Sequence, residues 1–337
     1  DDLTFRASSS VSSTSAAATQ QQPSAIQKKP APPTADPNAI RTHQSSIILG
    51  VGFLTAVYVG VYFWNPKFLP VARSYCDDHD LPLHPDTQLC YRPDLIAYKA
   101  ASFLAMCYMG LTGFYRFHFS PSLRKEYQQH VDHKKTDDAD IAMIEYRVFG
   151  KSVAASKEKS SKISIAADDQ STAILCYQIW DFVVSVTIPE HADPIFLFHH
   201  IMTGATAYYS LFYRFVPYYS IFYGGCTEVS SIFLVLLDLD TLLHDLAEPQ
   251  ADSANILNGI VEASKISFAV AFALYRVYGW LSRCVMMWND CHYAMAHYET
   301  TKARPLSFLY VFLTTGVVLG ALQLYWMGLI IQEGMKG

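Results

Sequence analysis

Residues 306–331 read LSFLYVFLTTGVVLGALQLYWMGLII and contain no charged side chain. A bilayer core about 30 Å thick is crossed by a helix of about 20 apolar residues, so this stretch is long enough to span a membrane. The sequence therefore predicts an all-α fold, a multi-pass transmembrane helical bundle of about seven spans. The six other apolar stretches lie at residues 46–64, 95–117, 172–188, 194–213, 217–237 and 258–280.

The composition agrees with this fold class. Of the 337 residues, 51% are apolar and only 16% are charged, whereas a soluble protein carries about 25% charged residues. The formal net charge of −5 provides no overall basic character for a nucleic acid. A membrane protein without a nucleic-acid partner is therefore predicted.

The distribution of Lys and Arg predicts the orientation. Nineteen of these residues lie in the N-terminal segment and in the alternate loops that share its side of the membrane, against four on the other side. Because basic residues are enriched in cytoplasmic loops, we expect the N-terminus inside and the C-terminus outside.

The chain divides by composition. The first 44 residues are rich in Ser, Ala, Thr, Gln and Pro and should form a disordered or partner-bound polar tail. This tail begins Asp1-Asp2 rather than with Met, which indicates a processed or incomplete N-terminus. The predicted segments are the tail (1–44), a first span (45–64), an outside loop (65–93), a domain of six spans (94–331) that includes a long inside loop (119–171), and a short tail (332–337).

The loop at 119–171 has about equal numbers of acids and bases and a weakly helical stretch near 141–149. It is interpreted as a solvated connector, with docking on anionic lipids or on a partner as the alternative.

The cysteines do not form a dense disulfide framework. Cys76 and Cys90 share one polar loop, where they are either two free thiols or a disulfide if the loop faces an oxidising compartment. The expected orientation puts this loop outside, which is consistent with the disulfide. The other five lie in or beside apolar stretches, where Cys acts as a small hydrophobe.

Polar residues inside the spans are the candidate functional residues, because each ionised group there costs at least ~2.5 kcal/mol. Glu262 and Lys265 are three residues apart and are expected to pair with each other. Arg276 and Asp238 lie near span ends, from which they can snorkel to the interface. The deeper polar residues in the third to fifth spans are Asp181, His199, His200, Thr203, Glu228 and Ser231.

Neighbouring histidines point about 100° apart around a helix, so we expect one of His199 and His200 to face a ligand and the other to support packing. Thr203 is three residues beyond His200 and is expected to fix its tautomer. A zinc site combining either histidine with Asp181 and Glu228 is conceivable by residue type, but the spacing is not that of a metal motif. No metal and no cofactor are therefore predicted.

Five motifs follow one another in order along the spans. They are Tyr177-x3-Asp181, Phe198-His199-His200-x2-Thr203, Glu228-x-Ser230-Ser231, Asn255-x2-Asn258-Gly259 and Phe272-x2-Tyr275-Arg276. Together they resemble the TLC-domain family, which includes ceramide synthases, translocon-associated membrane proteins and proteins that regulate membrane lipids. The resemblance covers roughly residues 94–331 and implies about six helices around a cavity that opens to the membrane, with the His pair inward.

The resemblance also implies site residues. In ceramide synthases the two histidines lie beside the acyl-transfer site, which makes His199 and His200 the catalytic candidates, as general base and orienting residue. Ceramide synthases have His-Asp and further acids where this chain reads CTEVSS at 226–231, so ceramide synthase activity is not expected. Whether an acyltransferase-like reaction occurs stays open. The residues expected to line the cavity are Asp181, Thr203, Glu228, Ser231 and Arg276.

Two functions remain. The first is lipid binding, lipid homeostasis or lipid modification through a polar intramembrane cavity, with membrane lipids as partners. The second is a non-catalytic accessory subunit of a larger membrane complex, in which residues 1–44 and 119–171 would contact other membrane-protein subunits. The family resemblance implies the endoplasmic reticulum or endomembrane; a cleaved presequence would instead indicate the mitochondrial inner membrane or a plastid.

Overall fold

The computed structural model describes residues 39–335, apart from short gaps. Most of the tail predicted at residues 1–44 lies outside the described residues, whereas residues 39–44 belong to the first helix rather than to the tail. The gaps are 65–69, 72, 79–80, 86–87, 133–138, 152–160, 244–251 and 303.

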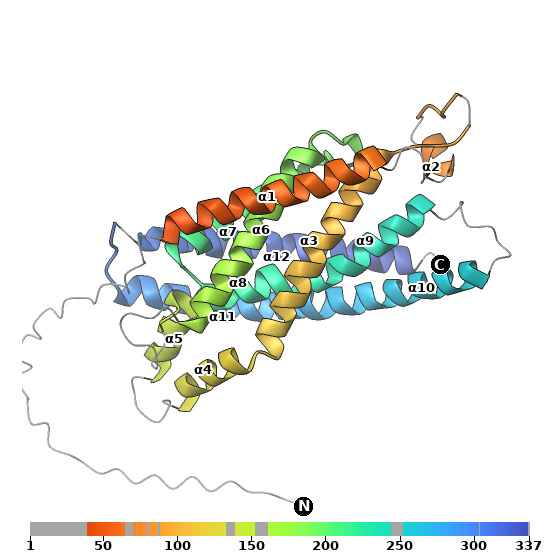
Figure 1. The fold of residues 1–337 in the computed structure, drawn as a ribbon. Coiled ribbons are helices and arrows are strands. Elements are labelled where there is room, and N and C mark those ends of the chain that lie inside the picture. Colours follow the sequence, from red (N-terminus) through yellow and green to blue (C-terminus); the bar gives the residue numbers. More distant parts are fainter. Residues whose placement is uncertain are drawn as a thin grey trace, which may run out of the picture.

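Seven long helical segments run alternately in opposite directions and form one bundle (Figure 1). Each overlaps one of the seven apolar stretches, and within the described residues the fold is all-α, as predicted. Two of the segments each join α-helices through a π-helical stretch. The segments are α1 (Ala39–Trp64), α3 (Pro93–His118), α6 (Lys162–Ser185), α7 (Pro194–Tyr213), α8–η4–α9 (Pro217–Ile221, Phe222–Cys226, Glu228–Leu243), α10–η6–α11 (Asp252–Ala271, Phe272–Gly279, Trp280–His297) and α12 (Leu309–Gly334), which follows the short η7 (Leu306–Phe308).

Four segments are long and apolar enough to cross a membrane by length and composition among the described residues. The protein is therefore an integral membrane protein, whereas α6, α7 and the α10–α11 segment do not meet this hydropathy criterion. The four spans are His43–Trp64, Pro93–His118, Pro217–Asp238 and Leu306–Gln332.

One end of the bundle is capped by helices α4 (Pro121–Asp132) and α5 (Ala139–Phe149) (Figure 1). Tyr146 of α5 is 1% exposed, and Arg147 forms an ion pair with Asp290 of α11 at 2.6 Å. The interpretation of 119–171 as a solvated connector was therefore wrong over α5, because an apolar face and a buried ion pair fasten this helix to the bundle. Residues 133–138 and 152–160 of the stretch lie outside the described residues.

The opposite end carries α2 (Arg73–Asp78), the turn η3 (Pro189–His191) and the disulfide between Cys76 and Cys90. Arg92 donates hydrogen bonds to both carboxylate oxygens of Glu190 in η3, and Tyr75 donates another at 3.2 Å. The hydrogen bond from Arg92 lowers the pKa of Glu190 to about 2. These contacts attach the disulfide loop to the turn that precedes α7.

Helix α3 crosses η4 with backbone in direct contact. A Cβ atom added to Gly113 would lie 2.2 Å from the Cα atom of Gly225, so neither position has room for a side chain. Gly225 lies in η4, and π-helical turns of this kind are frequent at functional sites. The second π-helical stretch, η6, contributes to the same region of the bundle.

Two predicted arrangements of charges have different outcomes. Lys265 and Glu262 pair at 2.6 Å, which confirms the expectation from their spacing. Asp238 does not snorkel but pairs with Lys99 of α3 at 2.5 Å, because Lys99 is 9% exposed and has its cation beside α9.

Candidate functional site

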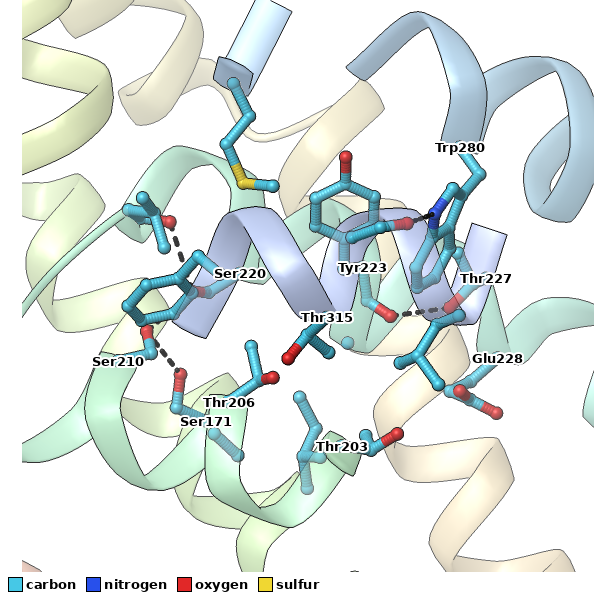
Figure 2. Close-up of a pocket in the computed structure, with 18 of the residues that line it drawn as sticks. Ser171, Thr203, Thr206, Ser210, Ser220, Tyr223, Thr227, Glu228, Trp280 and Thr315 are labelled. Atoms are coloured by element: carbon cyan, nitrogen blue, oxygen red, sulfur yellow. Dashed lines mark hydrogen bonds between the residues drawn. The ribbon is translucent and has the colours of Figure 1, made fainter. Parts of the chain in front are cut away.

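A pocket of about 60 Å³ lies inside the bundle, between α6, α7, the η4 region, η6, α11 and α12 (Figure 2). Its wall combines apolar side chains such as Ile174, Phe312 and Leu319 with several hydroxyl groups. The Ser and Thr residues that line it are Ser171, Thr203, Thr206, Ser210, Ser220, Thr227 and Thr315.

Most of these hydroxyls have partners within the protein. Ser171 donates to Ser210 at 3.2 Å, and Ser210 lies 2.6 Å from Ser220. Thr206 donates to the Met202 carbonyl of its own helix at 2.8 Å. These groups therefore need no further ligand to satisfy them.

Three polar atoms of the pocket wall lack such a partner. Nδ1 of His199, Oγ1 of Thr203 and Oγ1 of Thr315 are buried and make no hydrogen bond to any described residue. In Figure 2, Thr203 of α7 and Thr315 of α12 lie on facing sides of the pocket. A buried polar group without a partner costs about 1–3 kcal/mol. The pocket is therefore suited to a polar occupant and would hold about four water molecules.

The charged part of the wall is the pair of Glu228 and Arg276. Nη2 of Arg276 lies 3.0 Å from Oε2 of Glu228 and 2.7 Å from Oγ of Ser231, while its Nε donates to Oγ of Ser230 at 2.8 Å. The Arg276 side chain is 11% exposed. The prediction that Arg276 snorkels to the interface was wrong, because acceptors on α9 and α12 and the Thr227 carbonyl hold its guanidinium inside the bundle.

The two histidines have separate surroundings. His199 lines the pocket, and its ring lies 5.4 Å from that of Trp326. His200 is 4% exposed and faces α6, with its Nε2 2.8 Å from Oδ2 of Asp181 and its Nδ1 hydrogen-bonded to Gln178.

Thr203 does not set the tautomer of His200, contrary to prediction. The two ring nitrogens of His200 contact Gln178 and Asp181 of α6 instead. At 3.6 residues per turn, two side chains four positions apart differ by about 40° around the helix, and two that are three positions apart differ by about 60°. Thr203 is four positions from His199 and three from His200. Thr203 therefore lies on the side of His199, in the pocket wall.

Residues 170–332 match the family model of the TLC domain. The chain carries a TLC domain. Comparison with curated proteins and with solved structures finds no match. All the residues that line the pocket, from Ser171 to Gln323, fall within the matched segment, so the pocket belongs to the TLC domain. Helices α1 and α3 precede this segment in the chain and pack on it.

The predicted site residues fall into two groups within the TLC domain. His199, Thr203, Glu228 and Arg276 line the pocket, and Ser231 lies directly behind it through its bonds to the charged pair. The buried pair of Asp181 and His200 lies between α6 and α7 and is not part of the pocket wall. The side chains of the predicted motif at 255–258 lie outside the described residues.

Sequence reasoning missed two polar contributors. Thr315 and Gln323 lie on the strongly apolar helix α12, yet are 3% and 1% exposed. Gln323 accepts from Nη1 of Arg276 at 3.5 Å. The signal that could have identified Gln323 is an amide in a stretch otherwise free of large polar side chains.

Proposed function

We propose that this integral membrane protein handles lipid through its TLC-domain pocket, which binds an uncharged, hydrogen-bonding part of a membrane lipid. One observation carries the proposal: three buried polar atoms of a single pocket have no partner among the described residues. They are His199 Nδ1, Thr203 Oγ1 and Thr315 Oγ1.

The charges of the wall support an uncharged group. Glu228 and Arg276 are paired, so the pocket presents neither a free cation for a phosphate nor a free anion for an amine. Its volume of about 60 Å³ is smaller than a whole lipid. A hydroxyl or amide of the lipid would therefore enter the pocket while the acyl chains stay against the apolar helices. His199 is the residue positioned to take a proton from such a hydroxyl.

The proposed orientation places the α4–α5 end inside and the disulfide end outside. The α4–α5 end carries most of the basic residues, as cytoplasmic segments do. The bridge between Cys76 and Cys90 fits the oxidising side of an endomembrane. The family resemblance supports the endoplasmic reticulum as the location.

The test compares three hydroxyls of the same pocket. Thr203→Val and Thr315→Val remove the groups that have no partner, whereas Thr206→Val removes one that already bonds to its own helix. The lipids that copurify with the detergent-solubilised protein are extracted and quantified by mass spectrometry. One hydrogen bond is worth about 0.5–1.5 kcal/mol, so each of the first two variants should retain roughly 2- to 13-fold less of the bound lipid.

Thr206→Val should retain the wild-type amount. The melting temperatures of Thr203→Val and Thr315→Val should be unchanged or higher without lipid, because a buried, unpartnered hydroxyl is replaced by a methyl group. Equal losses in all three variants, or no copurifying lipid in the wild type, would refute the proposal.

A further inference from the structure

A second hollow, of about 600 Å³, lies on the outer surface of the bundle. It is formed by the end of α3, the start of α4 and the start of α6, and we name it the α3–α6 groove. The residues that line it are Leu111, Thr112, Tyr115, Arg116, Ser120, Ser122, Leu123, Lys162, Ile165, Ala166 and Asp169.

One part of the α3–α6 groove is apolar and exposed. Leu111, Tyr115 and Ile165 have exposed fractions of 59%, 55% and 53%. The exposed face of α3 continues beyond the groove through Tyr108 and Leu104, which follow the helical spacing of Leu111 and Tyr115. In an integral membrane protein this strip faces the acyl chains of lipids.

The other part of the groove is polar and carries a net positive charge. Arg116 donates to the Ala166 carbonyl and to Oδ2 of Asp169, each at 3.0 Å, so the carboxylate of Asp169 is already paired. Lys162 is exposed and makes no ion pair with any described residue. The hydroxyls of Ser120 and Ser122 lie 3.2 Å apart on the same rim.

The polar rim lies where the chain leaves the apolar part of the bundle. Helix α3 ends at His118 and α6 begins at Lys162, at the end of the bundle that also holds α4 and α5 (Figure 1). The groove thus leads from a lipid-facing apolar strip to a free cation at the membrane edge. An anionic phospholipid has this same order of parts, with chains in the hydrocarbon and a negative phosphate and head group at the interface.

We propose that the α3–α6 groove binds one anionic phospholipid, with its head group at Lys162 and Ser122 and its chains along Leu111 and Tyr108. This site is distinct from the TLC-domain pocket, because α6 presents Ser171 and Ile174 to the pocket but different positions to the groove. The proposal does not depend on what the pocket binds.

The experiment uses the full chain in nanodiscs of phosphatidylcholine that contain a minority of phosphatidylserine. The protein is released into the gas phase, and the lipids that remain bound are identified by native mass spectrometry. The variants are Lys162→Gln and Lys162→Glu. Lys302→Gln is the matched control, since Lys302 is an exposed lysine at the same end of the bundle but does not line the groove.

Phosphatidylserine should be retained in preference to phosphatidylcholine by the wild type. One basic residue near an anionic surface is worth about 1 kcal/mol, so Lys162→Gln should lower the retention of phosphatidylserine about five-fold, and the charge reversal in Lys162→Glu should lower it further. Lys302→Gln should behave as the wild type.

Equal retention of the two lipids by the wild type would identify the groove as an ordinary boundary-lipid site and overturn the proposal, as would equal effects of Lys162→Gln and Lys302→Gln. The proposal would also be overturned if deletion of residues 1–38 raised the retained phosphatidylserine several-fold, because that result would mean that this segment of the chain, and not a lipid, occupies the groove in the full chain.

Discussion

Replacing Arg276 by Met should destabilise the protein more than replacing Glu228 by Gln, although both changes break the same ion pair. In Arg276→Met, the carboxylate of Glu228 loses its cation although its side chain is only 16% exposed, and the Ser231 hydroxyl is its remaining hydrogen-bond donor. Removing one partner of a buried pair in this way costs about 3–5 kcal/mol. In Glu228→Gln, the guanidinium keeps its bonds to Ser230, Ser231 and the Thr227 carbonyl. The expected loss is therefore about 1.5–3 kcal/mol, that of one charge-assisted hydrogen bond.

The assay is equilibrium unfolding in mixed micelles of a mild detergent and dodecyl sulfate, followed by tryptophan fluorescence. Glu262→Gln is the control, because it makes the same chemical change in a pair whose side chains are 65% and 56% exposed, and it should cause no measurable loss. The double variant Glu228→Gln with Arg276→Met should be more stable than Arg276→Met alone, since no unpaired buried charge is left. Equal losses from the two single variants, or additive losses in the double variant, would refute this account of the pair.

Three further predictions concern the disulfide end of the bundle and the crossing of α3 with η4. The folded-state pKa of Glu190 is lowered to about 2 from an ordinary 4.5, so its ion pair stabilises the fold above about pH 4.5. The melting temperature should therefore fall as the pH decreases from 4.5 toward 2. Glu190→Gln should remove this part of the pH dependence, and an unchanged pH profile of the variant would contradict the assignment. Reduction of the disulfide between Cys76 and Cys90 should lower the free energy of unfolding by roughly 3 kcal/mol, the value for a loop of about 15 residues. Cys76→Ser is the control: because it lacks the bridge, a reductant should not change its stability, and a similar loss in this variant would contradict the prediction. Gly113→Ala should destabilise the protein by at least about 1–3 kcal/mol, because the added Cβ would meet backbone at 2.2 Å. In Gly52→Ala the added Cβ points into open space, so this variant should stabilise the protein by up to about 1 kcal/mol. A similar effect of both variants on the free energy of unfolding would argue against the close crossing.

The helical segments could be predicted because each contains a predominantly apolar stretch of about the length that crosses a bilayer. The start of α6 was placed ten residues too late because Asp168, Asp169 and Gln170 interrupt the apolar pattern. Their partners come from distant parts of the chain. Asp168 accepts from Arg214 at 2.9 Å, and the Gln170 amide donates to the Gly224 carbonyl at 2.6 Å. Hydropathy treats such residues as exposed, whereas tertiary contacts bury Gln170 fully and Asp168 in part.

The site was predictable in its residue types but not in its geometry. The spacing of His199 and His200 shows that they point in different directions, but which one faces the pocket depends on the helix packed beside each. Gln178 and Asp181 hold His200 against α6, which leaves His199 for the pocket. The inward direction of Arg276 likewise depends on acceptors about 45 residues earlier in the chain.

The most direct test of the central claim is an experimental structure of the full chain in lipid nanodiscs, at a resolution that shows the contents of the TLC-domain pocket. The account predicts density for an uncharged polar group of a lipid within hydrogen-bonding distance of Thr203, Thr315 and His199. A pocket that holds an acyl chain, holds only water, or is closed by direct bonds among these three side chains would contradict it.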